Sequence, residues 1–227
     1  FYGFSAGWRI SEEDYIKAIY EFTFEKGTEL VRTSDISSYF GFTDQTVNEM
    51  IKKLVTRKMV NFLPYKGVKL TADGKKEAVR MVRAHRIWEV FLTQKLKFNW
   101  SDVHEHAETL EHASSPTVLK ALYDYLDAPQ YCSHGNPIPD EHGHMGKLST
   151  LSLAELNTGD TFEIVRVLDY PELLSYLNKN DIALHNHFTV TNKESFNELW
   201  TIKQGDVEHV VSKKIAQMLY VEKQPSK

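Results

Sequence analysis

Residues 33–59 carry the pattern that most restricts the fold, which is two helical segments joined at a glycine-containing turn. The segment TSDISSYFGF (33–42) predicts a short helix, with Thr33 or Ser34 as the N-cap and a glycine at its end. The segment TDQTVNEMIKKLVTRKM (43–59) predicts a longer helix that Thr43 caps, with apolar residues at helical spacing. Two helices joined in this way form a helix-turn-helix.

A short hairpin is predicted directly after these two helices. The segment VNFLPYKGVKLT (60–71) is rich in Val, Phe, Tyr and Leu, and its centre, Pro64 to Gly67, has the composition of a turn. A helix-turn-helix followed by a hairpin is a winged helix. Helix-turn-helix modules place their second helix in the major groove of DNA.

Four further helices flank the winged helix, and each has a recognisable start. The segment SEEDYIKAIYEFTFEK (11–26) begins with Ser11 as N-cap and acids in the first turn. A long helical stretch covers residues 71–96. A third helix covers residues 100–114 with Ser101 as N-cap, and a fourth covers residues 115–127 with Ser115 as N-cap and proline at the first helical position.

The last third of the chain has a different character. Residues 128–147 contain three prolines and three glycines without periodicity, which predicts a linker. Short runs with β-branched and aromatic residues follow and predict a small β-rich unit of about 75 residues. The runs are residues 161–168, 187–193, 199–205 and 210–223, with one helix at residues 171–180.

Composition sets limits on the class of protein. The formal net charge is −4, so any DNA-binding surface has to be a local basic patch. No apolar run approaches the ~18–20 residues that span a bilayer, and the opening residues lack the pattern of a secretory signal. The single cysteine, Cys132, excludes an internal disulfide and is typical of a reducing cytosol. We therefore expect a cytoplasmic protein without a membrane partner.

One helix concentrates side chains that can bind metal ions. The stretch VHEHAETLEH (103–112) contains three histidines and three glutamates in ten positions. Four of them fall within an arc of about 100° beside an apolar stripe. These four are His104, Glu108, Glu111 and His112. Taken alone, the stretch is either a ligand-binding face or a solvated helix with incidental histidines.

Local charge supports DNA contact by the winged helix. Between Arg32 and Lys75 there are eight Lys or Arg residues against four acids. Side chains at the start of the second helix read base edges, and lysines contact phosphates. The predicted base-facing residues are Gln45, Thr46, Asn48 and Glu49, and the predicted phosphate-facing residues are Lys52, Lys53 and Lys66. The alternative is that these lysines are only the polar face of an amphipathic helix.

Several motifs in a fixed order resemble the diphtheria-toxin-repressor family of metal-dependent transcriptional repressors. The motifs are EDYIKAIYE (13–21), RAHRIWEVFL (83–92), HEHAETLEH (104–112) and CSHGNPIP (132–139). The CSH motif and RVLD (166–169) make the chain similar to the three-domain, manganese-responsive branch of Gram-positive bacteria. The resemblance covers the chain from about Glu12 to Glu222.

The resemblance implies an α+β protein with three domains. These are an N-terminal winged helix-turn-helix (1–75), a helical dimerisation and metal-binding domain with its linker (76–147), and a small β-rich, SH3-like (FeoA-like) domain (148–227). It also implies a homodimer on double-stranded operator DNA. The candidate apolar interface is Ile87, Val90, Phe91, Leu110, Leu119 and Leu122.

Two metal sites per subunit are implied by the same resemblance. The first, which activates DNA binding, matches Asp14, Glu108, Glu111 and His112. The second matches His85, Glu89, His104, His134 and Asp169, and Cys132 is assigned to either. Iron-type members carry Met and Cys where Asp14 and Glu108 stand here. Two hard carboxylates at these positions favour Mn²⁺, with Fe²⁺ and Zn²⁺ as alternatives.

The leading hypothesis is a metal-activated, dimeric repressor that senses manganese or iron and controls metal-uptake genes. One alternative is a metal-dependent hydrolase with a His/Glu site, and another is a metal-blind winged helix whose metal only stabilises the fold. The second helix of the predicted helix-turn-helix (43–59) lacks the Pro or Gly that family members usually carry near its start. The operator sequence is therefore the property least transferable from the family to this chain. Six histidines are predicted to be solvated: His106, His142, His144, His185, His187 and His209.

Overall fold

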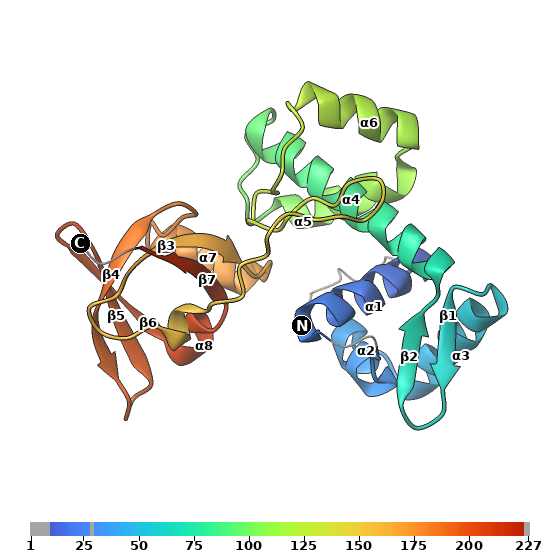
Figure 1. Cartoon of the computed structure of the whole chain (residues 1–227), viewed down its shortest axis with the longest axis horizontal. Coiled ribbons are helices and arrows are strands. Elements are labelled where there is room, and N and C mark those ends of the chain that lie inside the picture. The colour runs from blue at the N-terminus through green and yellow to red at the C-terminus, as the bar shows by residue number, and fades with distance from the viewer. Residues whose placement is uncertain (1–9, 28–29, 225–227) are drawn as a thin grey trace. The chain divides into compact units, whose positions relative to one another are not determined.

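The computed structural model describes residues 10–27 and 30–224, and the chain divides into two units (Figure 1). The first unit comprises residues 1–85 and 139–144, and the second comprises residues 86–138 and 145–227. The opening segment 1–9, which the sequence analysis excluded as a secretory signal, lies outside the described residues.

The first unit contains the winged helix, as the sequence predicted. Its elements are α1 (Glu12–Lys26), α2 (Thr33–Phe40), α3 (Asp44–Thr56), β1 (Val60–Leu63), β2 (Gly67–Leu70) and the first half of α4 (Ala72–Gln94). Strands β1 and β2 pair antiparallel around the predicted turn. The core residues Ile36, Val47 and Leu54 are fully buried and hold α2 against α3.

Local capping explains most helix boundaries in the first unit. Ser11 and Asp14 form a reciprocal capping box at the start of α1, and Gly27 ends that helix with a positive φ of 62°. The predicted N-cap of α2, Thr33 or Ser34, was wrong. Arg32 occupies the cap position, its carbonyl accepts the first backbone hydrogen bonds, and no side chain caps the helix.

The recognition helix and the wing follow the sequence closely. Thr43 caps α3 by accepting a hydrogen bond from the amide of Thr46, as predicted. The helix ends at Thr56, three residues before the predicted end, and Lys58 adopts a left-handed φ of 60°. The wing is fixed to the chain before α2 by two hydrogen bonds between the backbones of Val31 and Val68, of 2.9 and 2.8 Å.

Three helices open the second unit: the second half of α4, α5 (Val103–Ala113) and α6 (Pro116–Tyr125). Ser115 caps α6 as predicted, with proline in its first turn. The predicted N-cap Ser101 of α5 was wrong. Asp102 is in the cap position without a side-chain cap, and the Ser101 hydroxyl instead bonds to Asn99 and Asp102.

The six residues predicted for the dimer interface differ in burial, since Phe91, Leu110 and Leu122 are partly exposed. Ile87 and Val90 are buried within one chain, where they pack with Leu126, Cys132 and Ile138. Leu119 is buried as well, with 5% of its surface exposed. Since these side chains already have a core to fill, they are not a free surface for a second subunit.

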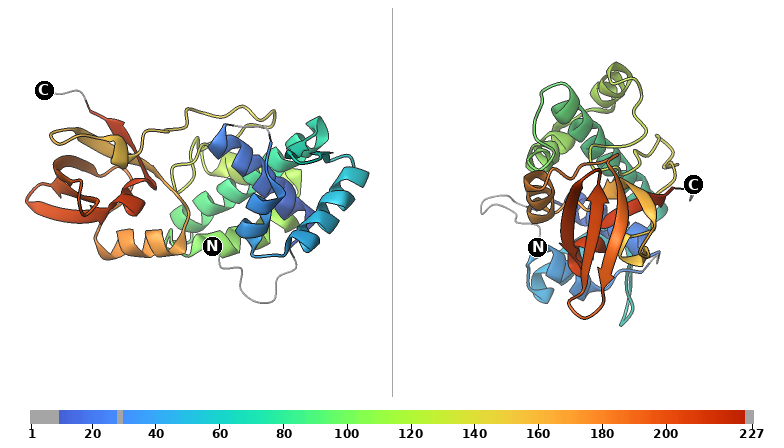
Figure 2. Two further views of the ribbon diagram at one scale, coloured as in Figure 1. Left: turned by 90° about the horizontal axis from the view of Figure 1, so that it is seen from below. Right: turned by 90° about the vertical axis from the view of Figure 1, so that its left-hand side faces the viewer.

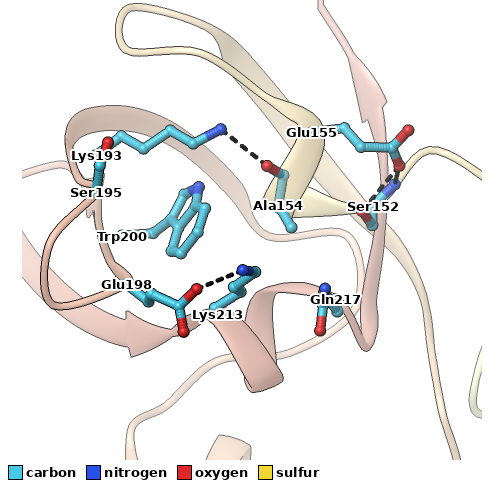
Figure 3. A pocket seen from close by; sticks show the side chains of 9 residues that line it. All are labelled: Ser152, Ala154, Glu155, Lys193, Ser195, Glu198, Trp200, Lys213 and Gln217. Atoms are coloured by element: carbon cyan, nitrogen blue, oxygen red, sulfur yellow. Dashed lines mark hydrogen bonds and ion pairs between the residues drawn. The ribbon is translucent and has the colours of Figure 1, made fainter.

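The C-terminal part of the second unit is a five-stranded antiparallel sheet in the order β6-β5-β4-β3-β7 (Figure 2). Its elements are η1 (Leu153–Glu155), β3 (Thr161–Val167), α7 (Pro171–Lys179), β4 (His187–Glu194), β5 (Leu199–Gln204), β6 (Val207–Ser212), α8 (Lys213–Ala216) and β7 (Leu219–Lys223). The predicted run 210–223 is not one strand, because Ser212 caps the short helix α8 between β6 and β7. Figure 3 shows the surface hollow beside η1 and α8, which Trp200 lines.

Gly67 permits the close approach of the wing to the chain before α2. Its φ is +128°, and a Cβ placed there would lie 2.2 Å from the carbonyl oxygen of Val31. We expect Gly67→Ala to cost about 1–3 kcal/mol of backbone strain and to expose the Val31 and Val68 amides to hydrogen exchange. Gly205→Ala is the matched control, because Gly205 also has a positive φ but no atom within 4 Å of the added Cβ. Equal protection of the Val31 and Val68 amides in both variants would contradict the prediction.

Candidate metal centre

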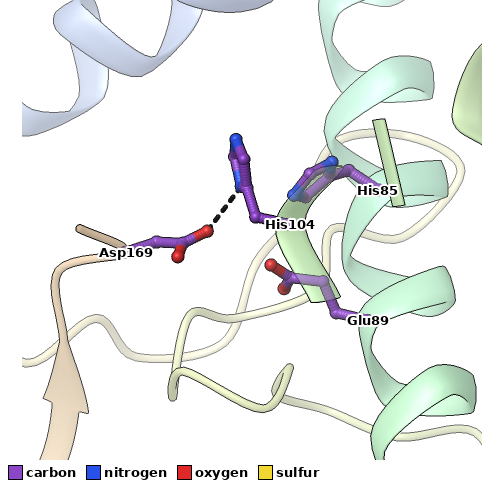
Figure 4. Close-up of side chains that lie close together, drawn as sticks. All are labelled: His85, Glu89, His104 and Asp169. Carbon is purple, nitrogen blue, oxygen red and sulfur yellow. Dashed lines mark ion pairs between the residues drawn. The ribbon is translucent and has the colours of Figure 1, made fainter. Parts of the chain in front are cut away.

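A cluster of buried and partly buried carboxylates and imidazoles lies in the second unit. The ligand atoms of Glu89, His104 and Asp169 lie within 4.8 Å of one another, and so do those of Glu89, Cys132 and His134. Glu89 comes from α4, His104 from α5 and Asp169 from the chain after β3 (Figure 4). Five of the residues predicted from the sequence are therefore brought together.

A tight turn brings His134 to this cluster. The backbone closes between Cys132 and Asn136, and the carbonyl of His134 accepts a 3.0 Å hydrogen bond from the amide of Val167 on β3. Gly135 has a φ of +81°, and a Cβ there would lie 2.0 Å from the carbonyl oxygen of Val165. The glycine therefore lets this turn rest directly on the strand that leads to Asp169.

The hydrogen bonds of His134 determine which ring nitrogen faces the carboxylates. Its Nε2 lies 2.8 Å from the carbonyl oxygen of Trp100 and therefore carries the proton that it donates. Its buried Nδ1 lies 3.1 Å from Oε1 of Glu89 and makes no hydrogen bond of good geometry with the described residues. A ring lone pair facing a carboxylate is repulsive, so this position requires a cation, either a second proton or a metal ion.

His104 lies between two carboxylates. Its Nδ1 is 2.6 Å from Oδ2 of Asp169, and its Nε2 is 3.3 Å from Oε1 of Glu108. Burial lowers the pKa of His104, but the charge of Asp169 and then that of Glu108 outweigh it and hold this pKa well above its usual value. The pKa of His134 is also raised, since Asp169 and Glu89 outweigh its burial. The neighbouring carboxylates therefore favour the protonated form of both rings.

The donor set fits a divalent cation. Glu89 and Asp169 bring two negative charges into a site where Glu89 is 2% exposed, and buried charges are stable only when they are paired. Carboxylates and imidazoles are ligands for Mn²⁺, Fe²⁺ and Zn²⁺. Cys132 is buried beside Glu89 and His134, and burial, followed by the charge of Glu89, raises the pKa of its thiol.

His85 lies on α4 one helical turn before Glu89, so the two side chains leave the same face of that helix. It is the last residue of the first unit and is buried there. Its Nδ1 lies 3.3 Å from Nζ of Lys17 on α1. Lys17 itself is only 5% exposed.

The residues of the other predicted metal set are found in both units. Asp14 is in the first unit, where its carboxylate accepts hydrogen bonds from the amide and hydroxyl of Ser11. Glu108, Glu111 and His112 are on α5 in the second unit. Glu111 is fully buried, and its Oε1 lies 3.9 Å from Nε2 of the exposed His112.

The predicted DNA-facing residues are mostly exposed. Gln45, Thr46, Glu49, Lys52, Lys53 and Lys66 are exposed, and Asn48 is partly buried. Lys53 forms an ion pair with Glu12, whose Oε1 lies 2.7 Å from Nζ of Lys53. Glu12 also pairs with Arg57. The hydrogen bond from Lys53 is the largest cause of the lowered pKa of Glu12.

Two residues near these sites were missed by sequence reasoning. Trp100 supplies the carbonyl that orients His134, and its ring stacks on the His134 ring with centroids 6.0 Å apart. A backbone carbonyl leaves no signal in the sequence. Tyr65 stands fully exposed in the turn of the wing, and the turn signal at Pro64 to Gly67 is the feature that identifies its position.

Family models account for most of the chain. Residues 10–68 match the N-terminal DNA-binding domain of the iron-dependent repressors. Residues 71–140 match the metal-binding and dimerisation domain of the same repressors, and residues 151–223 match a FeoA domain. These matches confirm the predicted fold class, in which a winged helix-turn-helix and a helical domain precede an SH3-like, FeoA domain.

Individual relatives agree with these matches. The chain is 32% identical to the transcriptional regulator MntR of Geobacillus thermodenitrificans over 116 residues, covering 51% of this chain and 80% of the relative. It is 28% identical to the diphtheria toxin repressor of Corynebacterium glutamicum over 159 residues, covering 70% of this chain and 65% of that repressor. It spans only 29% of a probable metal transport membrane protein of Chlamydia trachomatis, to which it is 30% identical over 56% of its own length.

Solved structures extend the likeness to nearly the whole chain. A manganese-dependent transcriptional repressor in complex with manganese has a TM-score of 0.84 at 29% identity, covering 94% of this chain and all of the other. A winged helix joined to a helical domain with buried carboxylates and imidazoles defines the class, a metal-dependent DNA-binding regulator. The chain belongs to the diphtheria-toxin-repressor family of metal-dependent transcriptional repressors, in its three-domain, manganese-responsive branch.

None of the helices within residues 10–27 and 30–224 combines the length and apolar character needed to cross a bilayer.

The raised pKa values of His104 and His134 predict how the metal-free protein responds to pH. Because both values lie above the unfolded value of about 6.5, the stabilisation is fully present below that pH and is lost as pH rises through the folded values. Urea unfolding with a chelator should therefore show a lower free energy of unfolding at pH 8 than at pH 6. His134→Gln should reduce this difference, and a variant with an unchanged pH dependence would contradict the assignment.

Proposed function

We propose that this protein is a manganese-responsive repressor that binds operator DNA when metal is present and controls metal-uptake genes. The observation that carries the proposal is the buried cluster of Glu89, His104, His134 and Asp169 in a chain with a winged helix. Iron and zinc remain the alternative effectors. A protein that binds DNA acts where the DNA is, which supports the cytoplasm as its location. The three proposed domains have the boundaries 1–75, 76–147 and 148–227.

We assign each subunit two metal sites. Asp14, Glu108, Glu111 and His112 form the first, and the three carboxylates among them favour Mn²⁺. His85, Glu89, His104, His134 and Asp169 form the second. Cys132 lies beside Glu89 and His134, so we assign it to the second set and not to the first. When bound, the metal supplies positive charge that replaces the protons on the imidazoles.

The ligands of the first site lie on two helices, and this division would explain how metal binding switches DNA binding. Asp14 lies on α1 of the winged helix, whereas Glu108, Glu111 and His112 lie on α5. A metal changes the population of the DNA-competent arrangement only through a difference in its affinity for the two arrangements. Donors on both helices provide such a difference, since the complete set exists only in one arrangement.

The winged helix is proposed to contact DNA through α3 and the wing. Gln45 and Thr46, with Asn48 and Glu49, face the bases at the start of α3, and Lys52 and Lys66 face phosphates. Lys53 contributes less than predicted because Glu12 neutralises part of its charge. Because residues 43–47 depart from the usual family pattern, the operator sequence is the feature least transferable from other family members.

A homodimer is proposed, because a single winged helix reads one half-site and two-fold operators need a two-fold protein. The apolar residues Val118, Leu122 and Tyr125 follow one face of α6 at i, i+4 and i+7. Val118 is 49% exposed and Tyr125 is 62% exposed. This face supports dimerisation better than the buried residues that the sequence suggested. A hydrolase is the weaker alternative, since MntR and the diphtheria toxin repressor are named as regulators.

The proposal is tested by Asp14→Ala. We expect the variant to bind Mn²⁺ more weakly and to lose the gain of operator affinity on adding metal, because three ligands remain but the link to α1 does not. The substitution also removes a helix cap worth about 1 kcal/mol. Ser11→Ala is therefore the matched control, since it removes the same capping box and keeps the Asp14 carboxylate.

Calorimetry and operator binding with and without Mn²⁺ measure the two effects separately. The control should respond to Mn²⁺ like the wild type. An Asp14→Ala variant that responds fully to Mn²⁺ would show that Asp14 is not part of the switch. A Ser11→Ala control that also loses the response to Mn²⁺ would show that Asp14 acts only by capping α1.

Substitutions in the wing and in α3 should affect DNA binding differently. Lys66→Ala should weaken binding to all sequences alike and reduce the slope of log affinity against log salt by roughly one. Gln45→Ala should instead reduce discrimination at particular bases. Lys214→Ala, an exposed lysine of α8, is the control and should leave the slope unchanged. A change of base preference in Lys66→Ala with an unchanged slope would show that the wing is wrongly assigned.

A further inference from the structure

The turn Asp140–His144 contains two histidines that the proposed function does not use. The sequence predicted His142 and His144 to be solvated, and both are exposed. The structure adds that their rings contact each other, with centroids 6.1 Å apart. This arrangement lies in the first unit, on residues outside both proposed metal sites.

The turn is held in place by bonds within itself and to α4. The amide of Asp140 donates to the carbonyl of His144 at 2.8 Å, and the amide of Gly143 donates back to Asp140 at 3.1 Å. Oδ1 of Asp140 accepts the amides of His142 and His144, both at 2.8 Å. Arg83 bonds to the carbonyl of the preceding proline at 2.6 Å, and a Cβ on Gly143 would lie 3.2 Å from Val79. The two imidazoles therefore project from a fixed backbone.

Asp140 determines the tautomer of His144. The hydrogen bond to the His144 ring is the largest of several that lower the pKa of Asp140 to about 2, so the carboxylate is charged and accepts only. Its Oδ2 lies 3.0 Å from Nδ1 of His144, which must donate. Nε2 of His144 is then left with a lone pair, and a carboxylate that orients a ring in this way is the usual partner of a metal-binding histidine.

The spacing of the two rings is close to that of a shared ion. Two imidazoles bound to zinc at about 2.0–2.1 Å place their ring centroids roughly 5 Å apart in a tetrahedral site. The His142 and His144 centroids are 6.1 Å apart, and small rotations of these exposed side chains would bring them to the distance of a shared ion. His185 is similarly exposed and lies 2.7 Å from Glu163, but no other histidine ring contacts it within the described part of the chain.

We propose that His142 and His144, oriented by Asp140, form a third metal site on the surface, for a late divalent transition ion such as Zn²⁺, Cu²⁺ or Ni²⁺. Imidazole ligands favour these ions, whereas Mn²⁺ prefers oxygen-rich sites. Solvent molecules complete the coordination because the histidines are exposed. The site is independent of the operator response to Mn²⁺.

Asp140→Asn separates the orienting role from the structural one. Asparagine keeps an oxygen for the two backbone amides but presents an amide NH₂ to Nδ1 of His144. The ring then accepts at Nδ1 and carries its proton on Nε2, where the metal would bind. We expect zinc affinity at this site to fall about 10–100-fold, the usual effect of losing such a partner.

Equilibrium dialysis of the full chain against Zn²⁺ tests the proposal. We expect the His142→Ala/His144→Ala double variant to hold one equivalent of zinc fewer than the wild type and to keep its operator response to Mn²⁺. His185→Ala is the matched control and should hold as much zinc as the wild type. Equal zinc in the double variant and the wild type, or an equal loss in the control, would overturn the proposal.

Chemical modification identifies the site directly. Diethylpyrocarbonate acylates accessible imidazoles, and mass spectrometry of peptides locates the products. Zn²⁺ should protect His142 and His144 and leave His185 reactive, whereas Mn²⁺ should protect none of the three. Modification of His142 and His144 at the same rate with and without Zn²⁺ would overturn the proposal, whatever the outcome of the operator experiments.

Discussion

The second unit depends on placing two carboxylates, Glu89 and Asp169, inside a protein beside two imidazoles. Buried carboxylates are stable only with a counter-charge, and here His104 and His134 supply it while they carry protons. The same nitrogens are the ones that a divalent ion needs. A metal ion bound at the proposed second site would therefore compete with protons for one set of atoms.

Several separate segments have to meet for this cluster to form. Glu89 needs the inner face of α4, His104 needs α5, and His134 needs a turn that Gly135 lets approach β3. The carbonyl of Trp100 fixes the His134 ring, and the Trp100 indole donates a 2.5 Å hydrogen bond to Asn178 on α7. The C-terminal sheet thus helps to shape the proposed second site, because β3 leads to Asp169 and supports the turn that carries His134.

Short-range signals in the sequence predicted most of the fold. Ser11, Thr43 and Ser115 are caps, and Pro64 to Gly67 is a turn, because each acts on atoms within a few residues. The N-caps of α2 and α5 were predicted wrongly because neither helix begins with a hydrogen bond from a capping side chain. No residue type in the sequence indicates such a start. The predicted β-rich run at residues 210–223 includes parts of β6 and β7, and the short helix α8 between them was not predicted.

Candidate ligands were predictable by type and by family resemblance, but their partners were not. The lone pair of His134, the contact of Lys17 with His85, and the approach of His142 to His144 arise from distances between segments or from the shape of a turn. The burial of Ile87 and Val90 was not predictable for a related reason, because such residues look alike in sequence whether they meet their own chain or a second one.

The ion pairs of Glu12 with Lys53 and Arg57 bear on the way this protein approaches DNA. Salt dependence of binding arises from counterions released when basic side chains neutralise phosphates. Two of the basic side chains on and just after α3 already have a carboxylate as their counterion, so they release little when they reach the duplex. For the DNA binding proposed above, ionic strength is consequently expected to influence affinity less than the excess of basic residues in the winged helix suggests.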